Sequence, residues 1–336
     1  MDYVVLGRTG LRVSRLALGT ALLGLVPPKE EAEDLVRAAL NHGINLFDCA
    51  NTYGNRATFD RPGMPPAAER MHAEELLGLA LRGIRDEVVL CTKVSEPVGP
   101  GVNDGGFGTL IPGGVRGGGL SRYHIMREVE RSLRRLATDH IDIYHFHHPD
   151  SDTAIEETLR AADDLVRQGK VRYIALSTYP AWQMTQAVMT ADHADLARPV
   201  LNQVHYNLLS REVEADVVPA ALEFGVGLTC FSPLAGGALA GTDVLQRQYV
   251  GAKRWGHDQD FSVRQKEAAA NLEELADAWG SAPAQLALAW LLSRPAVSTA
   301  IIGPENAAEL SQNASAADLR LDAEQCDQLS RAVSAS

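Results

Sequence analysis

An alternation of short apolar runs with amphipathic segments is the feature that most constrains the fold of this 336-residue chain. Eight runs read as strands, and a segment with helical periodicity follows each of them. Strands that alternate with helices predict a parallel sheet, because every crossover returns the chain to the same edge. The expected strands are 16–18, 45–48, 88–92, 141–146, 171–176, 200–205, 227–231 and 299–302, and the expected helices are 30–42, 72–82, 122–136, 154–168, 181–191, 212–224, 264–279 and 304–313.

This alternation fits either a doubly wound open sheet or a closed barrel. An open sheet that binds dinucleotides usually has a glycine-rich turn after its first strand, and no G-x-G-x-x-G occurs in this chain. We therefore predict an α/β fold, a (β/α)8 TIM barrel, with an N-terminal β-hairpin formed by 3–6 and 11–13 and long loops at the carboxyl ends of its strands. Because one such barrel commonly exceeds about 250 residues, the whole chain, 1–336, is predicted to be a single domain.

Charge and cysteine content limit which binding partners and which cellular compartment are expected for this chain. The net charge of −12 predicts an acidic surface, which repels nucleic acid and anionic membranes. The four cysteines, Cys49, Cys91, Cys230 and Cys326, form no C-x-x-C pair and are predicted to be reduced thiols. The N-terminus has no signal-peptide pattern and no apolar run is long enough to span a bilayer, so a cytoplasmic protein is expected. The oligomeric state stays open, homo-oligomers included.

Three long connections follow predicted strands: 55–71, 95–119 with its ten glycines, and 242–261. Barrel enzymes build their active sites from loops at the carboxyl ends of the strands, so we expect these loops to be functional. Their aromatic residues, and one on the helix after the second loop, are candidates to line a substrate pocket: Phe59, Phe107, Tyr123, Trp255 and His257.

Four side chains with complementary chemistry lie at the ends of three consecutive strands: Asp48, Tyr53, Lys93 and His147. A phenol has a pKa of about 10, and a nearby ammonium lowers the pKa of a phenol by roughly 1–3 units. Lys93 would thus make Tyr53 a better general acid. Asp48 would keep the buried Lys93 charged, and His147 would bond to the substrate oxygen.

Structural explanations compete with this interpretation. A single lysine on a strand is usually part of an ion pair, and a single tyrosine after a strand usually packs. His145, His147 and His148 could be core polar residues or a metal cluster. Alternation places His148 on the other face of the strand, and no carboxylate stands at helical ligand spacing, so no metal site is predicted.

Eight segments, in this order, carry a resemblance to a known family: LGRTGLRVSRLALGT, GINLFDCANTYG, VVLCTK, SLRRLATDHIDIYHFHHPD, LVRQGKVRYIALS, VLNQVHYNLLSRE, FSPLAGGALAG and IIGPENAAEL. They span nearly the whole chain, which resembles the aldo-keto reductases of the branch related to potassium-channel β-subunits. The resemblance implies a catalytic tetrad of Asp48, Tyr53, Lys93 and His147. The family pattern D-x-Y-x-x-H selects His147 over His145 and His148.

The resemblance also implies a nicotinamide cofactor bound along the carboxyl rim of the barrel. The matching positions are Ser177 and Gln203 for the carboxamide, Phe231 for stacking on the ring, Ser232, Leu234 and Gly236 for the pyrophosphate, Gly303, Glu309 and Asn313 for the adenosine end, and Gly19 and Thr20 elsewhere in the cofactor site.

Departures from the family pattern bear on the cofactor. Thr178 stands where relatives often have Asn or Arg. At the adenosine end, Glu305 and Glu309 stand where many relatives place a cation for the 2′-phosphate, and carboxylates repel a phosphate. Arg247, Lys253 and Arg254 could compensate. We therefore predict NADP from the habit of the family, with room for NAD.

The predicted function is NAD(P)H-dependent reduction of an aldehyde or ketone to an alcohol, with Tyr53 as the general acid. The substrate would be a small carbonyl compound or polyol. An NAD-dependent aldose or alcohol dehydrogenase is the first alternative, because the cation for a 2′-phosphate is missing. The second is a non-catalytic regulatory subunit that binds the cofactor, as the resemblance to channel subunits implies.

Overall fold

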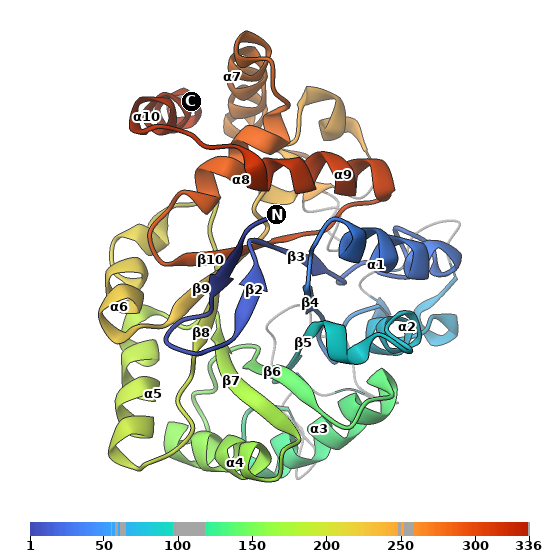
Figure 1. Cartoon of the computed structure of the whole chain (residues 1–336), viewed down its shortest axis with the longest axis vertical. Coiled ribbons are helices and arrows are strands. Elements are labelled where there is room, and N and C mark those ends of the chain that lie inside the picture. The colour runs from blue at the N-terminus through green and yellow to red at the C-terminus, as the bar shows by residue number, and fades with distance from the viewer. Residues whose placement is uncertain are drawn as a thin grey trace.

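The computed structural model describes residues 1–54, 56–57, 60, 65–96, 98, 118–247, 250–251 and 259–334. Its centre is a closed barrel of parallel strands, in which β10 pairs with β3 to complete the ring (Figure 1). This confirms the predicted (β/α)8 barrel. The strands are β3 (Leu16–Gly19), β4 (Leu46–Asp48), β5 (Val89–Val94), β6 (Ile141–Phe146), β7 (Val171–Ser177), β8 (Leu201–His205), β9 (Gly227–Phe231) and β10 (Val297–Ile302).

Burial on both faces explains why these strands read as continuous apolar runs. Every residue of β5 and β10 is buried, as parallel strands between a core and a helix layer require. Side chains that point into the barrel form one cluster, which includes Leu46, Cys91 and Ile143. A larger cluster joins the outer face of the strands to the helices.

The predicted N-terminal hairpin is present, formed by β1 (Tyr3–Val5) and β2 (Arg12–Ser14). It closes the amino-terminal end of the barrel. Figure 1 shows it across the centre of the ring. Its Leu6 and Val13 are fully buried in the inner cluster. At Gly7, a Cβ would lie 2.5 Å from the carbonyl oxygen of Val200, and φ is +53°, so only glycine fits there.

The predicted helices are present, with shifted ends in places. The region 212–224 has a short 3-10 turn at Glu212–Glu214 before α6, because Pro219 lacks an N–H and must lie in the first turn of the helix. The helices are α1 (Ala32–Asn41), α2 (Ala73–Ala80), α3 (Arg122–Leu136), α4 (Ile155–Arg167), α5 (Ala181–His193), α6 (Val217–Phe224), α7 (Val263–Trp279), α8 (Pro283–Leu292), α9 (Ala307–Ser315) and α10 (Ala323–Ser334).

The carboxy-terminal helices add a layer outside the ring. Figure 1 shows α7 and α10 together beyond α8, and α10 packs on both of them. Trp290 of α8 is fully buried, and its indole N–H donates to Ser330 of α10. Sequence reasoning missed α10, although Cys326, Leu329 and Val333 repeat with helical spacing and are buried.

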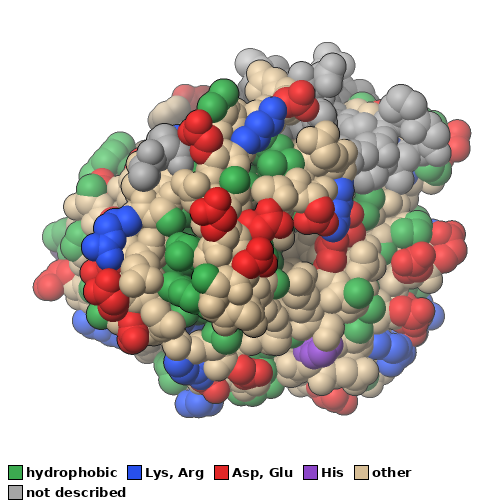
Figure 2. All heavy atoms as spheres, turned by 90° about the horizontal axis from the view of Figure 1, so that it is seen from above, with side chains coloured by type: hydrophobic (Ala, Val, Ile, Leu, Met, Phe, Trp, Pro, Cys, Tyr) green, Lys and Arg blue, Asp and Glu red, His purple; other side chains and the backbone are tan. Residues whose placement is uncertain are grey.

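The surface agrees with the charge of the chain. Asp and Glu side chains gather near the middle of the face drawn in Figure 2. The residues that the structure describes include no helix long and apolar enough to cross a membrane. Of the candidates for a substrate pocket, Tyr123 is 55% exposed on α3 and does not line the pocket described below. The other aromatic candidates, Phe59, Phe107, Trp255 and His257, and the cations Lys253 and Arg254 lie outside the described residues.

Candidate active site

The barrel brings the four predicted catalytic residues to one rim. Asp48 ends β4, Tyr53 lies in the turn that follows, Lys93 is near the end of β5, and His147 comes directly after β6. The parallel register pairs Asp48 with Cys91, two residues before Lys93. Because side chains two residues apart on a strand share a face, Lys93 points to the inside like Cys91, just beyond the end of β4.

Lys93 is the centre of this arrangement. Its Nζ donates to Asp48 Oδ2 at 2.6 Å, to the Cys49 carbonyl oxygen at 2.8 Å and to the Tyr53 hydroxyl oxygen at 3.3 Å. The side chain is fully buried, which lowers the pKa of Lys93, but Asp48, Tyr53 and Cys49 together outweigh burial and raise this pKa above its ordinary value. Lys93 is therefore an ammonium held against the phenol.

Tyr53 differs from the expectation in one respect. Burial raises the pKa of Tyr53 to about 12, although Lys93 acts in the opposite direction. The expected net lowering of this pKa is therefore wrong, because the cost of burying a phenolate exceeds the attraction of the ammonium. Tyr53 is a protonated phenol throughout the neutral range.

His147 and His145 face the inside at this level. The prediction that His148 lies on the other face of the strand is wrong, because His147 and His148 follow the end of β6, where strand alternation no longer applies. The His148 ring stacks on His147, and both residues line the pocket described below. His147 is buried, and its ring meets the Tyr53 ring edge-on, with 6.0 Å between the ring centroids. His145 pairs in register with Lys93, and none of the side chains that the structure describes hydrogen-bonds to its ring, although the Leu176 backbone lies close to it. Burial lowers the pKa of His145 to about 3, so His145 is a neutral ring in the barrel core.

A pocket of about 640 Å³ opens over Tyr53 and runs along the carboxyl rim of the barrel. Asp48, Tyr53 and His147 line it at one end, whereas Lys93 is fully buried behind them. Thr20 does not line it either: its backbone N–H and its hydroxyl both donate to the Asp48 carbonyl oxygen at 2.9 Å. The other residues expected at a cofactor do line it: Gly19, Ser177, Gln203, Phe231, Ser232, Leu234, Gly236, Gly303, Glu309 and Asn313.

Comparison with known proteins decides the family. A family model described as "Aldo/keto reductase family" matches residues 15–334. The chain belongs to the aldo/keto reductase family. Similar proteins include an uncharacterised oxidoreductase, YrpG, of Bacillus subtilis (strain 168), which is 37% identical over 96% of this chain and 93% of its own length. As a member of the family, the protein is an NAD(P)-dependent oxidoreductase that acts on small carbonyl compounds.

Two further relatives differ in their described roles. A probable voltage-gated potassium channel subunit beta of Arabidopsis thaliana is 34% identical over 95% of this chain and 92% of its own length. A versiconal hemiacetal acetate reductase of Aspergillus parasiticus is 33% identical over 88% of this chain and 86% of its own length.

The pocket of this aldo/keto reductase suits a nicotinamide dinucleotide in shape. A Cβ on Gly19 would lie 2.7 Å from Cγ2 of Ile301, so a residue larger than glycine would clash with β10 at this point of the pocket wall. After β9, Ser232, Ala235 and Gly236 all have φ between +50° and +69°. A right-handed residue followed by a left-handed one, as at Leu234 and Ala235, forms a concave turn that presents backbone N–H groups to anions. The Phe231 ring is stacked on His205, with 5.2 Å between centroids, which fixes its orientation.

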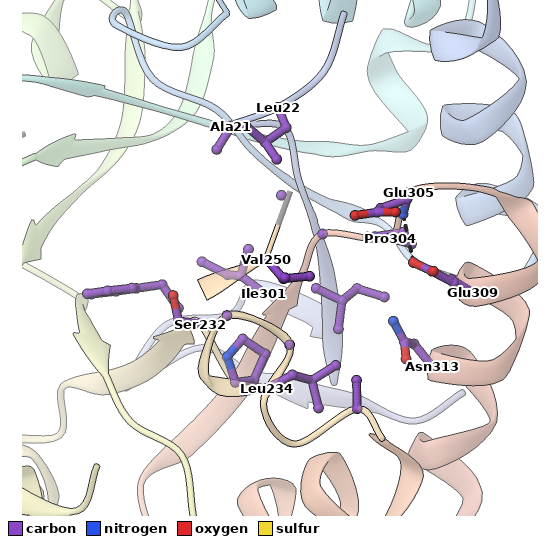
Figure 3. Close-up of a pocket in the computed structure, with 18 of the residues that line it drawn as sticks. Ala21, Leu22, Ser232, Leu234, Val250, Ile301, Pro304, Glu305, Glu309 and Asn313 are labelled. Carbon is purple, nitrogen blue, oxygen red and sulfur yellow. Dashed lines mark hydrogen bonds between the residues drawn. The ribbon is translucent and has the colours of Figure 1, made fainter. Parts of the chain in front are cut away.

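The far end of the pocket is acidic. Figure 3 shows Glu305 and Glu309 side by side near Asn313, away from Ser232 and Leu234. Glu309 accepts a hydrogen bond from the Glu305 backbone N–H at 2.9 Å and pairs with Arg247. Arg247 also lies 3.8 Å from Glu305 and 3.5 Å from Asp243. Arg247 was expected to compensate for the missing cation, but these three carboxylates already surround it.

Sequence reasoning missed one residue at this rim. Glu96, three residues after Lys93, is fully buried and contacts both His147 and His148. Glu96 does not stand at helical ligand spacing from the histidines, because it reaches them from the segment just past β5. Its position just past the end of β5 was the available signal.

Proposed function

We propose that this aldo/keto reductase reduces an aldehyde or ketone to an alcohol and that Tyr53 donates the proton to the substrate oxygen. The observation that carries the proposal is the 3.3 Å contact between the Tyr53 hydroxyl and the buried Lys93 ammonium, at the wall of a pocket of sufficient size. A phenol that is protonated at neutral pH and next to a cation can lose its proton to a developing alkoxide.

Each residue has a distinct task in this proposal. A bound nicotinamide cofactor would supply the hydride that adds to the carbonyl carbon. Tyr53 gives its proton to the oxygen, and Lys93 stabilises the phenolate that remains. Asp48 holds Lys93 in place and accepts from Gln203 Nε2 at 2.8 Å. The amide oxygen of Gln203 can then accept from a carboxamide, together with Ser177.

For the cofactor, the described residues favour NADH over the NADPH that family habit predicts. The single described cation at the far end of the pocket, Arg247, is already paired with carboxylates. A ribose 2′-hydroxyl can donate to Glu309 or Glu305, whereas a 2′-phosphate would be repelled by both. Wild-type kcat/KM values for the two cofactors test this: a preference for NADPH above about 100-fold, which is about 2.7 kcal/mol, contradicts it.

The same acidic end favours a second candidate, NAD-dependent oxidation of an alcohol or aldose, because oxidation in cells commonly uses NAD. A screen of polyols and free sugars with NAD, set against carbonyl compounds with NADH and NADPH, separates the two directions. Multiple turnovers with any small substrate would also separate both from a purely regulatory subunit of the kind that the Arabidopsis relative's description names.

Tyr53→Phe tests the proposal. The change removes one hydroxyl and keeps the ring, so we expect kcat/KM for carbonyl reduction to fall roughly 10²–10⁴-fold. The dissociation constant of the cofactor, measured by fluorescence titration, should stay nearly unchanged. The matched control is Tyr144→Phe, because Tyr144 is a buried tyrosine of β6 outside the pocket whose hydroxyl has no partner among the described residues. Near-wild-type turnover in Tyr53→Phe would remove Tyr53 from the mechanism.

A further inference from the structure

The Glu96 carboxylate lies between two histidine rings at the rim of the barrel. Its Oε2 is 3.1 Å from Nδ1 of His147, and its Oε1 is 3.1 Å from Nε2 of His148. The carboxylate is fully buried, and Asn51 fixes the local backbone by donating to the Glu96 carbonyl oxygen at 3.3 Å. On the other side, Nδ1 of His148 is 3.2 Å from the Thr178 hydroxyl oxygen.

These three residues have the composition of a metal site but not its geometry. The His147 and His148 rings are stacked, with centroids 4.6 Å apart and only 12° between their planes. A metal ion lies in the plane of each imidazole that binds it, because the nitrogen lone pair lies in that plane. Two nearly parallel rings, one above the other, cannot both direct a lone pair at one ion. The geometry therefore favours a hydrogen bond between Glu96 and His147, with His148 as a close electrostatic neighbour of the same carboxylate.

Glu96 is ionised in this arrangement. Burial raises the pKa of Glu96, but the two histidines outweigh burial and hold this pKa well below its ordinary value. An ionised carboxylate has acceptors only. The proton of the 3.1 Å contact must therefore belong to Nδ1 of His147. In a neutral ring Nε2 then carries no proton, and it can accept a hydrogen bond but cannot donate one.

This matters because a carbonyl oxygen is itself an acceptor. We propose that Glu96 is a positioning residue that keeps a proton on Nδ1 of His147, so that His147 donates from Nε2 to a carbonyl oxygen only as the imidazolium. The inference rests on the proposed carbonyl reduction. Tyr53 remains the source of the transferred proton, while His147 contributes a charged hydrogen bond that polarises the carbonyl. The Glu96 carboxylate balances that charge.

The groups around His147 set the pH range of this state. Burial lowers the pKa of His147, and Lys93 and His148 lower it further, whereas Glu96 raises it. The Tyr53 ring also faces His147 edge-on. On its own side, Glu96 is faced by His148 and has the buried His124 of α3 near its backbone. Glu96 is thus the one described anion among these neighbours that favours the imidazolium.

Nuclear magnetic resonance of the full-length protein, labelled with ¹⁵N-histidine, tests the proton position directly. Signals of His147 are assigned by their loss in His147→Asn. We expect a neutral ring protonated at Nδ1 at high pH, and a wild-type kcat/KM for carbonyl reduction that falls as pH rises through the pKa that the spectra give for His147. A neutral ring protonated at Nε2, or reduction that does not fall across that pKa, would overturn the inference.

Glu96→Gln removes the charge and keeps the size of the side chain. We expect the pKa of His147 to drop by roughly 1–3 units. The fall of kcat/KM with rising pH should shift to lower pH with it. Glu96→Asp should restore part of the shift. Glu128→Gln is the control, because Glu128 is an equally buried carboxylate that pairs with Arg127 and Arg131 instead. An unchanged pKa of His147 in Glu96→Gln would contradict the proposal.

These experiments distinguish a failure of the proposed carbonyl reduction from a failure of the proposed role of Glu96. A wild-type protein without carbonyl turnover refutes the proposed function and the role of His147 in it, while the spectra still decide which ring nitrogen carries the proton. If Glu96→Gln does not fold, the wild-type spectra and pH profile decide the inference alone.

Discussion

The carboxylates at the far end of the pocket give the most quantitative prediction. In Glu309→Gln, the side chain keeps an oxygen for the Glu305 N–H but loses the charge that pairs with Arg247. Arg247 then becomes available to a 2′-phosphate. We expect selectivity to move toward NADPH, and Glu305→Gln combined with Glu309→Gln to move it further.

The size of the effect follows from the charges. A phosphate monoester carries about −1.5 to −2 charges at pH 7. Two unit charges 4 Å apart interact by about 1 kcal/mol in water and by about 4 kcal/mol at an effective dielectric of 20. The side chains of Glu305 and Glu309 are 23% and 25% exposed, so they lie between these limits. About 2 kcal/mol for one carboxylate corresponds to a roughly 30-fold change in the NADPH/NADH ratio of kcat/KM.

The assay is the initial rate of cofactor oxidation with one carbonyl substrate and both cofactors, because the ratio cancels changes in the chemical step. Glu156→Gln is the control: it removes the same charge from an exposed pair with Arg160 on α4, remote from the pocket, and should leave the ratio unchanged. Arg247→Ala should lower the use of NADPH. A ratio within about twofold of wild type in the double variant, well below the 30-fold expected for one carboxylate, would refute the reasoning.

Two predictions concern stability. Gly78→Ala places a Cβ 2.5 Å from the Leu136 carbonyl oxygen, and it should lower the free energy of unfolding, measured in urea, by about 1–3 kcal/mol. In the control, Gly10→Ala, the new Cβ meets nothing within 4 Å, and the free energy of unfolding should stay within about 0.5 kcal/mol of wild type. Equal effects of the two variants would contradict the packing argument. Burial lowers the pKa of His145 to about 3 in the folded protein, whereas its pKa in the unfolded chain is about 6.5. Below about pH 6.5 the unfolded chain therefore binds a proton that the folded protein does not, and the free energy of unfolding decreases as the pH is lowered. From pH 6.5 to 4 this costs about 3 kcal/mol, and His145→Gln should lose that part of the acid sensitivity; identical pH dependence in both proteins would rule it out.

The barrel was predictable from sequence because its determinants are local. Strands buried on both faces, such as β5 and β10, read as uninterrupted apolar runs. The last helix, α10, was missed although its apolar spacing is regular, because the strand–helix count was already complete at eight. Tyr53 and Lys93 were found because they lie close to the carboxyl ends of two consecutive strands, β4 and β5.

The chemistry of the site depended on contacts between distant segments, which spacing does not show. Glu96 meets the histidines across two strands, and no sequence pattern predicts the stacked rings. Arg247 was expected to bind a 2′-phosphate, but its charge is neutralised by an ion pair with Glu309, which the sequence does not reveal. The sign of the pKa shift of Tyr53 depended on how completely it is buried.

A crystal structure with bound NAD⁺ tests the central claim most directly. The account predicts a nicotinamide ring against Phe231, its carboxamide at Ser177 and Gln203, and its reactive carbon on the side of the pocket that holds the Tyr53 hydroxyl. A nicotinamide bound elsewhere in the barrel, or turned so that another side chain faces its reactive carbon, would contradict the account.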